Sequence, residues 1–169
     1  NSVARTFERL QSKVQSIAAD LQADSLVEKF LPGREFSVAI LKAKHSVGFL
    51  VMPLELIAPA DKDGVRILSA EIKSADTERF VEIIDQDIKA KVAALAIDVF
   101  HALGARDYGR IDIRLDKDGA PQFLEANLIP SLLNGYGNFP KACMLNRRLG
   151  YEPMILHIVT LALARSIDA

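Results

Sequence analysis

The sequence predicts an α+β fold with a mainly antiparallel sheet, and three observations lead to this class. A charged hairpin pattern occupies residues 108–128, and strand patterns occur at 34–44 and 47–58. Helical patterns precede and follow these strands, but they do not alternate with them as a parallel α/β sheet requires. The chain has 169 residues, half of them hydrophobic, which is enough to bury one core. We therefore expect a single domain over residues 1–169.

The first third of the chain is predicted to form a helix and then strands. Apolar residues recur at every third or fourth position over residues 3–21, a spacing typical of an amphipathic helix. Strand patterns follow at residues 25–31, 34–44 and 47–58. The turn pair Pro32-Gly33 separates the first two patterns. Pro53 lies in the third, where its missing N–H predicts an edge strand or a bulge.

Helices are predicted on both sides of the hairpin. The helix expected over residues 78–103 ends before Gly104. Its apolar stripe is Val81, Ile84, Ile88, Val92, Leu95, Val99 and Ala102. A Gly/Asn-rich loop is expected over 131–140, followed by a helix from Lys141. A last helix opens at Pro153, a residue type favoured in the first turn. It is predicted to bury Ile155, Ile158, Val159, Ala162 and Leu163.

The first arm of the hairpin alternates charged and aliphatic residues between positions 110 and 115. The two kinds of side chain therefore lie on opposite faces of a strand. The run "DKDG" has turn chemistry. If the loop has an even length and the strands have no bulge, Asp112 shares a face with Glu125 and Asn127, and Arg110 joins them. The opposite face would then carry Ile111, Ile113, Leu124 and Ala126.

Asp112, Glu125 and Asn127 offer hard oxygen ligands of the kind that suits Mg²⁺, which takes one or two carboxylates and completes its shell with water and phosphates. Arg110 could stabilise negative charge on a transferred phosphoryl group. The alternative is a structural one, in which Arg110, Asp112 and Glu125 form a salt-bridged strand face and Asn127 caps the turn. Arg114 is predicted to be a charged strand end. The spacing alone leaves both interpretations open.

Composition excludes several classes of protein. The 21 basic and 22 acidic residues are mixed along the chain, with no basic block that indicates a nucleic-acid partner. The longest nearly apolar run, 154–164, is too short to span a membrane. One cysteine, Cys143, fits a reducing cytoplasmic compartment, and the first residues lack the apolar core of a signal peptide. The sequence contains no P-loop, G-x-G-x-x-G or G-x-S-x-G motif, and its histidines lack zinc-site spacing.

The segment "GRIDIRLDKDGAPQFLEANLIP" resembles the C-terminal signature of the ATP-grasp superfamily, specifically the D-alanine–D-alanine ligase family. The similarity continues through "LGYEPMILHIVTLALAR" and back to "VEKFLPGREFSVAIL". It implies the C-terminal portion of an ATP-grasp fold, with ATP and two Mg²⁺ ions as cofactors. By this resemblance Asp112 holds one ion, Glu125 bridges two and Asn127 completes the second site. Arg110 contacts the phosphoryl or tetrahedral charge.

The same resemblance assigns the adenosine end of ATP to the first half of the chain. The adenine edge would be read by Glu28, Lys29, Phe30 and Leu31. Glu35 would accept hydrogen bonds from the ribose hydroxyls, although such a residue after a Pro-Gly turn is more often a plain exposed strand residue. Lys73 lies where the family has a phosphate-binding lysine, and a solvated surface lysine is the alternative there.

Two departures from the family pattern limit these inferences. Pro130 is followed by Ser131, where the family has glycine, and the loop over 131–140 is about one residue longer than usual. The resemblance therefore does not give the acid and amine substrates. The first residues also lack the glycine-rich phosphate loop and the opposing lysines of such ligases. We therefore expect this chain to be a fragment of a longer ligase and inactive when isolated.

The expected function is that of an ATP-dependent carboxylate–amine ligase, which forms ADP through an acylphosphate. The expected partners are ATP, a small carboxylate or amino-acid substrate and the remainder of the ligase chain, without nucleic acid or membrane. The sequence leaves the oligomeric state undecided, and a homodimer is one of the alternatives. The alternatives are a non-catalytic nucleotide-binding fragment or regulatory module, and another ATP-grasp acid–amine or acid–thiol ligase.

Overall fold

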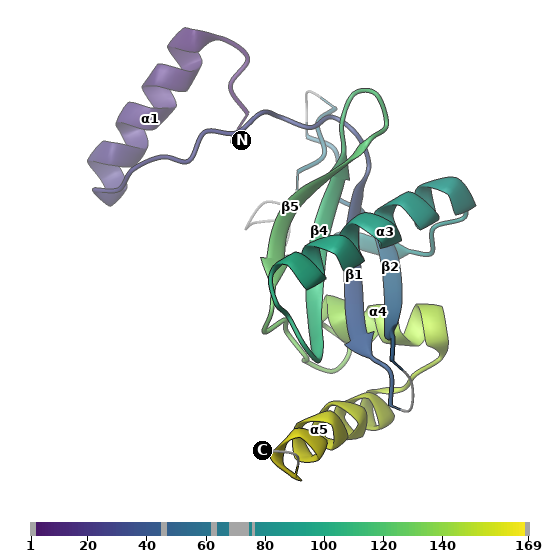
Figure 1. Cartoon of the computed structure of the whole chain (residues 1–169). Helices are drawn as coiled ribbons and strands as arrows, with labels where there is room; N and C mark the ends of the chain where they lie inside the picture. Colours follow the sequence, from purple (N-terminus) through teal and green to yellow (C-terminus); the bar gives the residue numbers. More distant parts are fainter. Residues whose placement is uncertain (1–2, 45–46, 62–63, 68–74, 76, 168–169) are drawn as a thin grey trace. The chain divides into compact units, whose positions relative to one another are not determined.

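The computed structural model describes residues 3–44, 47–61, 64–67, 75 and 77–167. The chain divides into two compact units, Asn1–Leu31 and Pro32–Ala169. The first contains helix α1, and the second contains a five-stranded sheet with helices α3, α4 and α5 (Figure 1). The relative positions of the two units are not determined.

In the first unit, α1 spans Phe7–Leu21 and confirms the predicted helix, which begins four residues later than expected. The hydroxyl of Thr6 caps it by accepting a hydrogen bond from the N–H of Arg9, and a left-handed Gln22 ends it. The strand predicted over residues 25–31 is wrong, because this segment has no regular structure. A strand needs a neighbour for its backbone groups, and the described residues of this unit contain no second strand.

The sheet of the second unit has the order β3-β2-β1-β4-β5, and every neighbouring pair is antiparallel, as predicted. The strands are β1 (Glu35–Lys42), β2 (Phe49–Ile57), β3 (Arg79–Val81), β4 (Tyr108–Leu115) and β5 (Pro121–Asn127). Strand β3 pairs only with Glu55–Ile57, so at Pro53 the outer side of β2 has no strand neighbour among the described residues. The local edge predicted at this proline is therefore confirmed. Its carbonyl accepts a hydrogen bond from Asn146 instead, at 3.2 Å.

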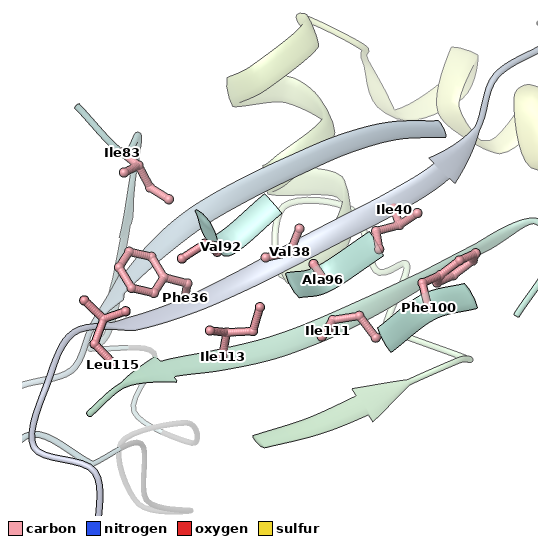
Figure 2. Packing of buried hydrophobic residues seen from close by; sticks show 10 residues of the cluster. All are labelled: Phe36, Val38, Ile40, Ile83, Val92, Ala96, Phe100, Ile111, Ile113 and Leu115. Carbon is pink, nitrogen blue, oxygen red and sulfur yellow. The ribbon is translucent and has the colours of Figure 1, made fainter. Parts of the chain in front are cut away.

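Helix α3, Gln86–Ala102, covers one face of the sheet. Figure 2 shows the buried cluster between them: Phe36, Val38, Ile40, Ile83, Val92, Ala96, Phe100, Ile111, Ile113 and Leu115. The helix begins eight residues later than predicted. Asp85 caps it by accepting from the N–H groups of Asp87 and Ile88. Part of the segment before this cap forms β3, and Ile84, predicted to lie on the buried stripe, is 87% exposed.

Helices α4 (Asn138–Arg147) and α5 (Tyr151–Ile167) pack over part of the opposite face. Their cluster includes Ala39, Leu41, Met52, Leu54, Phe139, Ala142, Cys143, Met154 and Leu161. Among the described side chains of α5, Met154, His157 and Leu161 are buried. Val159, Ala162 and Leu163, which were predicted to be buried, are exposed. The buried side of α5 therefore differs from the predicted one. His157 lies on this buried side, where its Nε2 donates to the carbonyl of Lys42 at 2.8 Å.

Among the described residues, no helix has the length and apolar character needed to cross a membrane. The apolar cluster under α4 and α5 uses Ala39 and Leu41 of β1. The same face of β1 carries polar side chains at Glu35 and Ser37, since side chains alternate along a strand. One face of the sheet is therefore apolar at one end and polar at the other.

A tight backbone contact at Gly33 gives a prediction about stability. An added Cβ there would lie 2.6 Å from the carbonyl oxygen of Leu115 and 2.7 Å from its Cβ. We expect Gly33→Ala to lower the free energy of unfolding by about 1–3 kcal/mol in a urea titration, because two backbones must separate. Gly150→Ala is the control, since its Cβ would make only ordinary contacts at 3.8 and 4.0 Å. Equal stability of the two variants would contradict the prediction.

Candidate nucleotide and metal site

The β4–β5 hairpin brings the predicted metal ligands to one face of the sheet. Asp112 lies opposite Glu125, and Arg110 lies opposite Asn127. Directly opposed residues of an antiparallel pair point to the same side. The four side chains predicted to converge therefore do so.

The register arises in a different way from the one predicted. The last pair at the turn is Leu115 with Pro121, so the loop is Asp116–Ala120, which has an odd length. A bulge between Asp112 and Ile113 leaves Leu124 without an opposing residue, so Ile113 lies opposite Phe123. The odd loop and the one-residue bulge cancel, and the pairing at Asp112 is the one that an even loop would give. The prediction of an even loop without a bulge is wrong.

Strand β1 extends this arrangement into three rows of side chains. Glu35 lies opposite Arg114, Ser37 opposite Asp112, and Ala39 opposite Arg110. We call the polar members of these rows the polar face. It consists of Glu35, Ser37, Arg110, Asp112, Arg114, Glu125 and Asn127. Gln122, which lies opposite Arg114, is left out because its side chain binds Asp116 of the turn.

Asp112 is the central carboxylate of the polar face. The hydroxyl of Ser37 donates to its Oδ1 at 2.8 Å, and Arg110 donates to the same carboxylate from Nε at 2.9 Å and from Nη2 at 2.7 Å. The side chains of Arg110 and Asp112 are only 14% and 15% exposed. Burial raises the pKa of Asp112, although the hydrogen bonds from Arg110 and Ser37 act against this. The carboxylate is therefore held in one orientation at a cost in desolvation.

Glu125 and Asn127 complete a group of oxygen donors. The amide nitrogen of Asn127 donates to Glu125 Oε1 at 3.1 Å and lies 3.5 Å from Asp112 Oδ2. One donor group thus reaches oxygens of both carboxylates, which shows that these oxygens converge. Turning the amide by about 180° exchanges its NH₂ and C=O groups, so the same side chain can present oxygen to a cation.

This donor set fits Mg²⁺. Two carboxylates and an amide oxygen are ligands that this ion accepts, with water and phosphate oxygens filling the other positions. Among the described residues, no three His, Cys, Asp or Glu side chains gather into a metal-binding group.

The structural alternative is partly present. Arg110 does form an ion pair with Asp112, and its Nη2 also lies 3.6 Å from Glu125 Oε1. Within the described part of the chain, the side chain of Asn127 contacts the carboxylates of Glu125 and Asp112 and does not cap the turn. Asp116 holds the turn instead, with Oδ1 accepting from the N–H groups of Asp118 and Ala120.

The residues predicted to bind the rest of the nucleotide lie in different parts of the structure. Glu35 lies on the polar face with its side chain 16% exposed, so a plain exposed strand residue is the wrong description. The adenine-binding residues Glu28, Lys29, Phe30 and Leu31 lie in the first unit, in a segment without regular structure. Lys73 lies outside the described residues.

Two residues of the polar face had no predicted role. Ser37 is 3% exposed and binds Asp112, a contact that depends on β1 lying beside β4. Arg114 lies at the end of β4, as expected, but its side chain is buried, with 7% exposed, and this burial was not predicted. The alternation that marked Arg110 and Asp112 continues to Arg114, and that signal could have found it.

The pKa values of two aspartates in the hairpin should be shifted in opposite directions from the ordinary value. Burial raises the pKa of Asp112 above 3.8, whereas hydrogen bonds from the backbone of Ala120 and Asp118 lower the pKa of Asp116. A carboxyl ¹³C NMR titration without divalent cations should show this order. Because folded Asp112 binds its proton more tightly than the unfolded chain does, its stabilising contribution is complete below pH 3.8 and is lost as the pH rises through the folded pKa.

An unfolding series follows from the same linkage. Relative to Asp112→Asn, the wild type should gain stability as the pH falls from neutral towards 3.8. A lower pKa for Asp112 than for Asp116 would contradict the account of this site.

Comparisons with known proteins show the family and the fold of this chain. The family model described as D-ala D-ala ligase C-terminus matches residues 2–160. A D-alanine–D-alanine ligase from Bordetella petrii is 34% identical over 116 residues, which cover 68% of this chain and 34% of that protein. D-alanine–D-alanine ligase A from Mesorhizobium japonicum is 32% identical over 157 residues, which cover 89% and 43%.

Solved structures show the same fold at lower sequence identity. The D-alanine–D-alanine ligase from Bacillus anthracis complexed with ATP has a TM-score of 0.68 at 20% identity, covering 95% of this chain and 49% of its own. The VanG D-Ala:D-Ser ligase from Enterococcus faecalis has a TM-score of 0.67 at 19% identity, covering 89% and 43%. This chain spans less than half the length of these relatives. It belongs to the D-alanine–D-alanine ligase C-terminal family and has the α+β fold of the corresponding part of ATP-grasp ligases.

Proposed function

We propose that this chain is the C-terminal part of the ATP-grasp domain of a longer, ATP-dependent carboxylate–amine ligase. The observation that carries the proposal is the convergence of Asp112, Glu125, Asn127 and Arg110 on one face of the hairpin. Membership of the ligase family supports it, as does the share of the relatives' length that this chain spans. The products of the reaction are ADP, phosphate and a new C–N bond.

The polar face binds the triphosphate end of ATP with its metal ions. Asp112, Glu125 and Asn127 would hold the Mg²⁺ ions, with Glu125 as the ligand that the family resemblance gives to both. Bound Mg²⁺ supplies positive charge that neutralises the phosphate oxygens. The chain's own contribution is orientation, since Ser37 and Arg110 hold Asp112 before any ligand arrives.

Arg110 contacts the charge that develops on the transferred group. Its guanidinium is fixed against Asp112 by two nitrogens, at 2.9 Å and 2.7 Å. A donor held in this way needs little reorganisation when negative charge grows nearby. Lys73 is proposed as a second phosphate contact, and this assignment rests on the family resemblance alone.

The adenosine end is assigned to the start of the chain. Glu28, Lys29, Phe30 and Leu31 contact the adenine, and Glu35 accepts hydrogen bonds from the ribose hydroxyls. The position of Glu35 on the polar face, in the row next to that of Asp112, supports its share of this role. A carboxylate is a suitable acceptor for vicinal hydroxyl groups.

The reaction follows from these assignments. The γ-phosphoryl group of ATP passes to a substrate carboxylate, and ADP leaves. An amino group then attacks the acylphosphate carbon and displaces phosphate, losing a proton as the amide forms. The relatives are named for D-alanine and D-serine, and Ser131 occupies the position where the family pattern has glycine. We therefore propose a small amino acid as substrate, without naming it.

An ADP-release assay of the complete ligase against a panel of amino acids tests the function. Release that requires both Mg²⁺ and one particular amino acid is the expected result. Binding of Mg-ATP without ADP release for any amino acid or other small amine would favour the non-catalytic nucleotide-binding module instead.

Removal of the negative charge of Glu125 should abolish most of the ADP-forming activity. Glu125→Gln in the complete ligase should lower the rate of ADP formation by roughly 10²-fold or more, because one charged ligand to both ions is lost. Glu82→Gln is a matched control, since the Glu82 side chain is 62% exposed and that of Glu125 is 59% exposed. Normal turnover by Glu125→Gln would show that this residue does not bind the metal.

The isolated 169-residue chain should bind Mg-ATP weakly and form no ADP. The proposed metal ligands need triphosphate oxygens to complete the coordination shell of Mg²⁺. These ligands, Asp112, Glu125 and Asn127, all lie on a single face of the sheet. Isothermal titration and an ADP assay measure both properties. Micromolar binding with steady ADP formation by this chain would contradict the proposal that it is one part of a longer catalyst.

A further inference from the structure

Arg114 occupies an unusual position for an arginine in a strand. It is 7% exposed, although its charge would normally keep it in water. It lies on the polar face, in the row next to that of Asp112, and its cross-strand neighbour on β1 is Glu35. A buried guanidinium needs acceptors for its N–H groups, because each one without a partner would be costly.

The acceptors come from three separate segments of the chain. Nη1 donates to Glu35 Oε2 at 3.0 Å, within β1. Nε donates to the carbonyl of Gly33 at 3.1 Å, just before β1. Nη2 donates to the carbonyl of Arg66 at 2.6 Å, in the segment 64–67 that follows β2. The planar fork of arginine can serve three acceptors in fixed directions, which the ammonium group of lysine cannot do.

This arrangement restrains Glu35 from two sides. Its backbone lies between two antiparallel neighbours, opposite Leu56 of β2 and Arg114 of β4, and its carboxylate is held by a group that is itself tied to two backbone carbonyls. A carboxylate accepts roughly four hydrogen bonds, so a contact with Arg114 is compatible with further bonds from hydroxyl groups. The ion pair therefore sets the direction in which Glu35 meets a ligand.

We propose that Arg114 is a positioning residue that orients Glu35 for the ribose hydroxyls of ATP and so sets the preference for ribonucleotides over deoxyribonucleotides. The inference rests on the proposed function, because it needs a nucleotide on the polar face. Arg114 acts through Glu35 and does not contact the reacting atoms.

The test compares ATP with 2′-deoxyATP and 3′-deoxyATP in the complete ligase. Glu35→Ala, Arg114→Met and Arg114→Lys should each raise the KM for ATP by about tenfold, with kcat changed by less than about twofold. Each should also reduce the discrimination against the deoxynucleotides. The double variant Glu35→Ala/Arg114→Met should discriminate no less than Glu35→Ala alone, since both changes remove the same contact.

A matched control exists on the other face of the sheet. Arg34 forms a two-pronged ion pair with Glu55, with distances of 2.8 and 2.6 Å, and Glu55 lies on β2 beside Phe36. Arg34→Met removes an arginine–glutamate pair without touching the polar face, so it should keep the ATP preference. If Arg114→Met does not fold, Arg114→Lys retains the charge and decides the question in the same assay.

The outcomes separate this inference from the function on which it rests. Loss of ribose discrimination in all three Glu35 and Arg114 variants, but not in Arg34→Met, supports the positioning role. Discrimination that survives in the folded Arg114 variants but is lost in Glu35→Ala overturns the positioning role alone. Discrimination that survives in Glu35→Ala overturns the ribose assignment of Glu35 and, with it, the inference about Arg114.

Discussion

The pairing of Asp112 with Glu125 is the constraint on which the polar face depends. A slip of one residue between β4 and β5 would turn Glu125 and Asn127 towards the face that α3 covers. The register survives two irregularities because the odd turn and the bulge at Leu124 offset each other. The turn is fixed by Asp116, and the far end of the hairpin is fixed by Ile111 in the buried cluster. Packing and turn chemistry together therefore position groups that take no part in packing.

One face of the sheet carries both a packing surface and the polar face, because the side chains of β1 on this face change from polar to apolar along the strand. Its Ala39 and Leu41 pack beneath α4 and α5, whereas Glu35 and Ser37 contact the charged residues of β4. The buried ion pair of Arg110 and Asp112 contributes little net stability, but removing either partner would typically cost about 3–5 kcal/mol. A pair of this kind is better explained by the orientation that it gives to Asp112. The raised pKa of Asp112 agrees with this, since the fold keeps a carboxylate where burial disfavours its charge.

Local patterns in the sequence were sufficient for part of this picture. The alternation through Arg110, Asp112 and Arg114 predicted a charged strand face. The face shared with Glu125 was expected from an even loop, and it occurs because a bulge offsets the odd loop. The bulge at Leu124 could not be predicted, because nothing in the local sequence distinguishes it from a paired strand residue. The helix expected from residue 78 failed because helical spacing continues through residues that pair with β2 instead, and the cap at Asp85 sets the actual start. Ser37 was missed because its partner is distant in the sequence, and contacts between distant strands are not encoded in local periodicity.

The most direct test of the central claim is to locate the metal in the complete ligase. A crystal structure with Mn²⁺ and a non-hydrolysable ATP analogue, with the ions placed by anomalous scattering, gives their ligands without an activity assay. The account predicts ions coordinated by carboxylate oxygens of Asp112 and Glu125 and by the amide oxygen of Asn127, with phosphate oxygens completing the shell. Ions bound to the nucleotide elsewhere, with the Asn127 amide nitrogen still donating to Glu125, would contradict it.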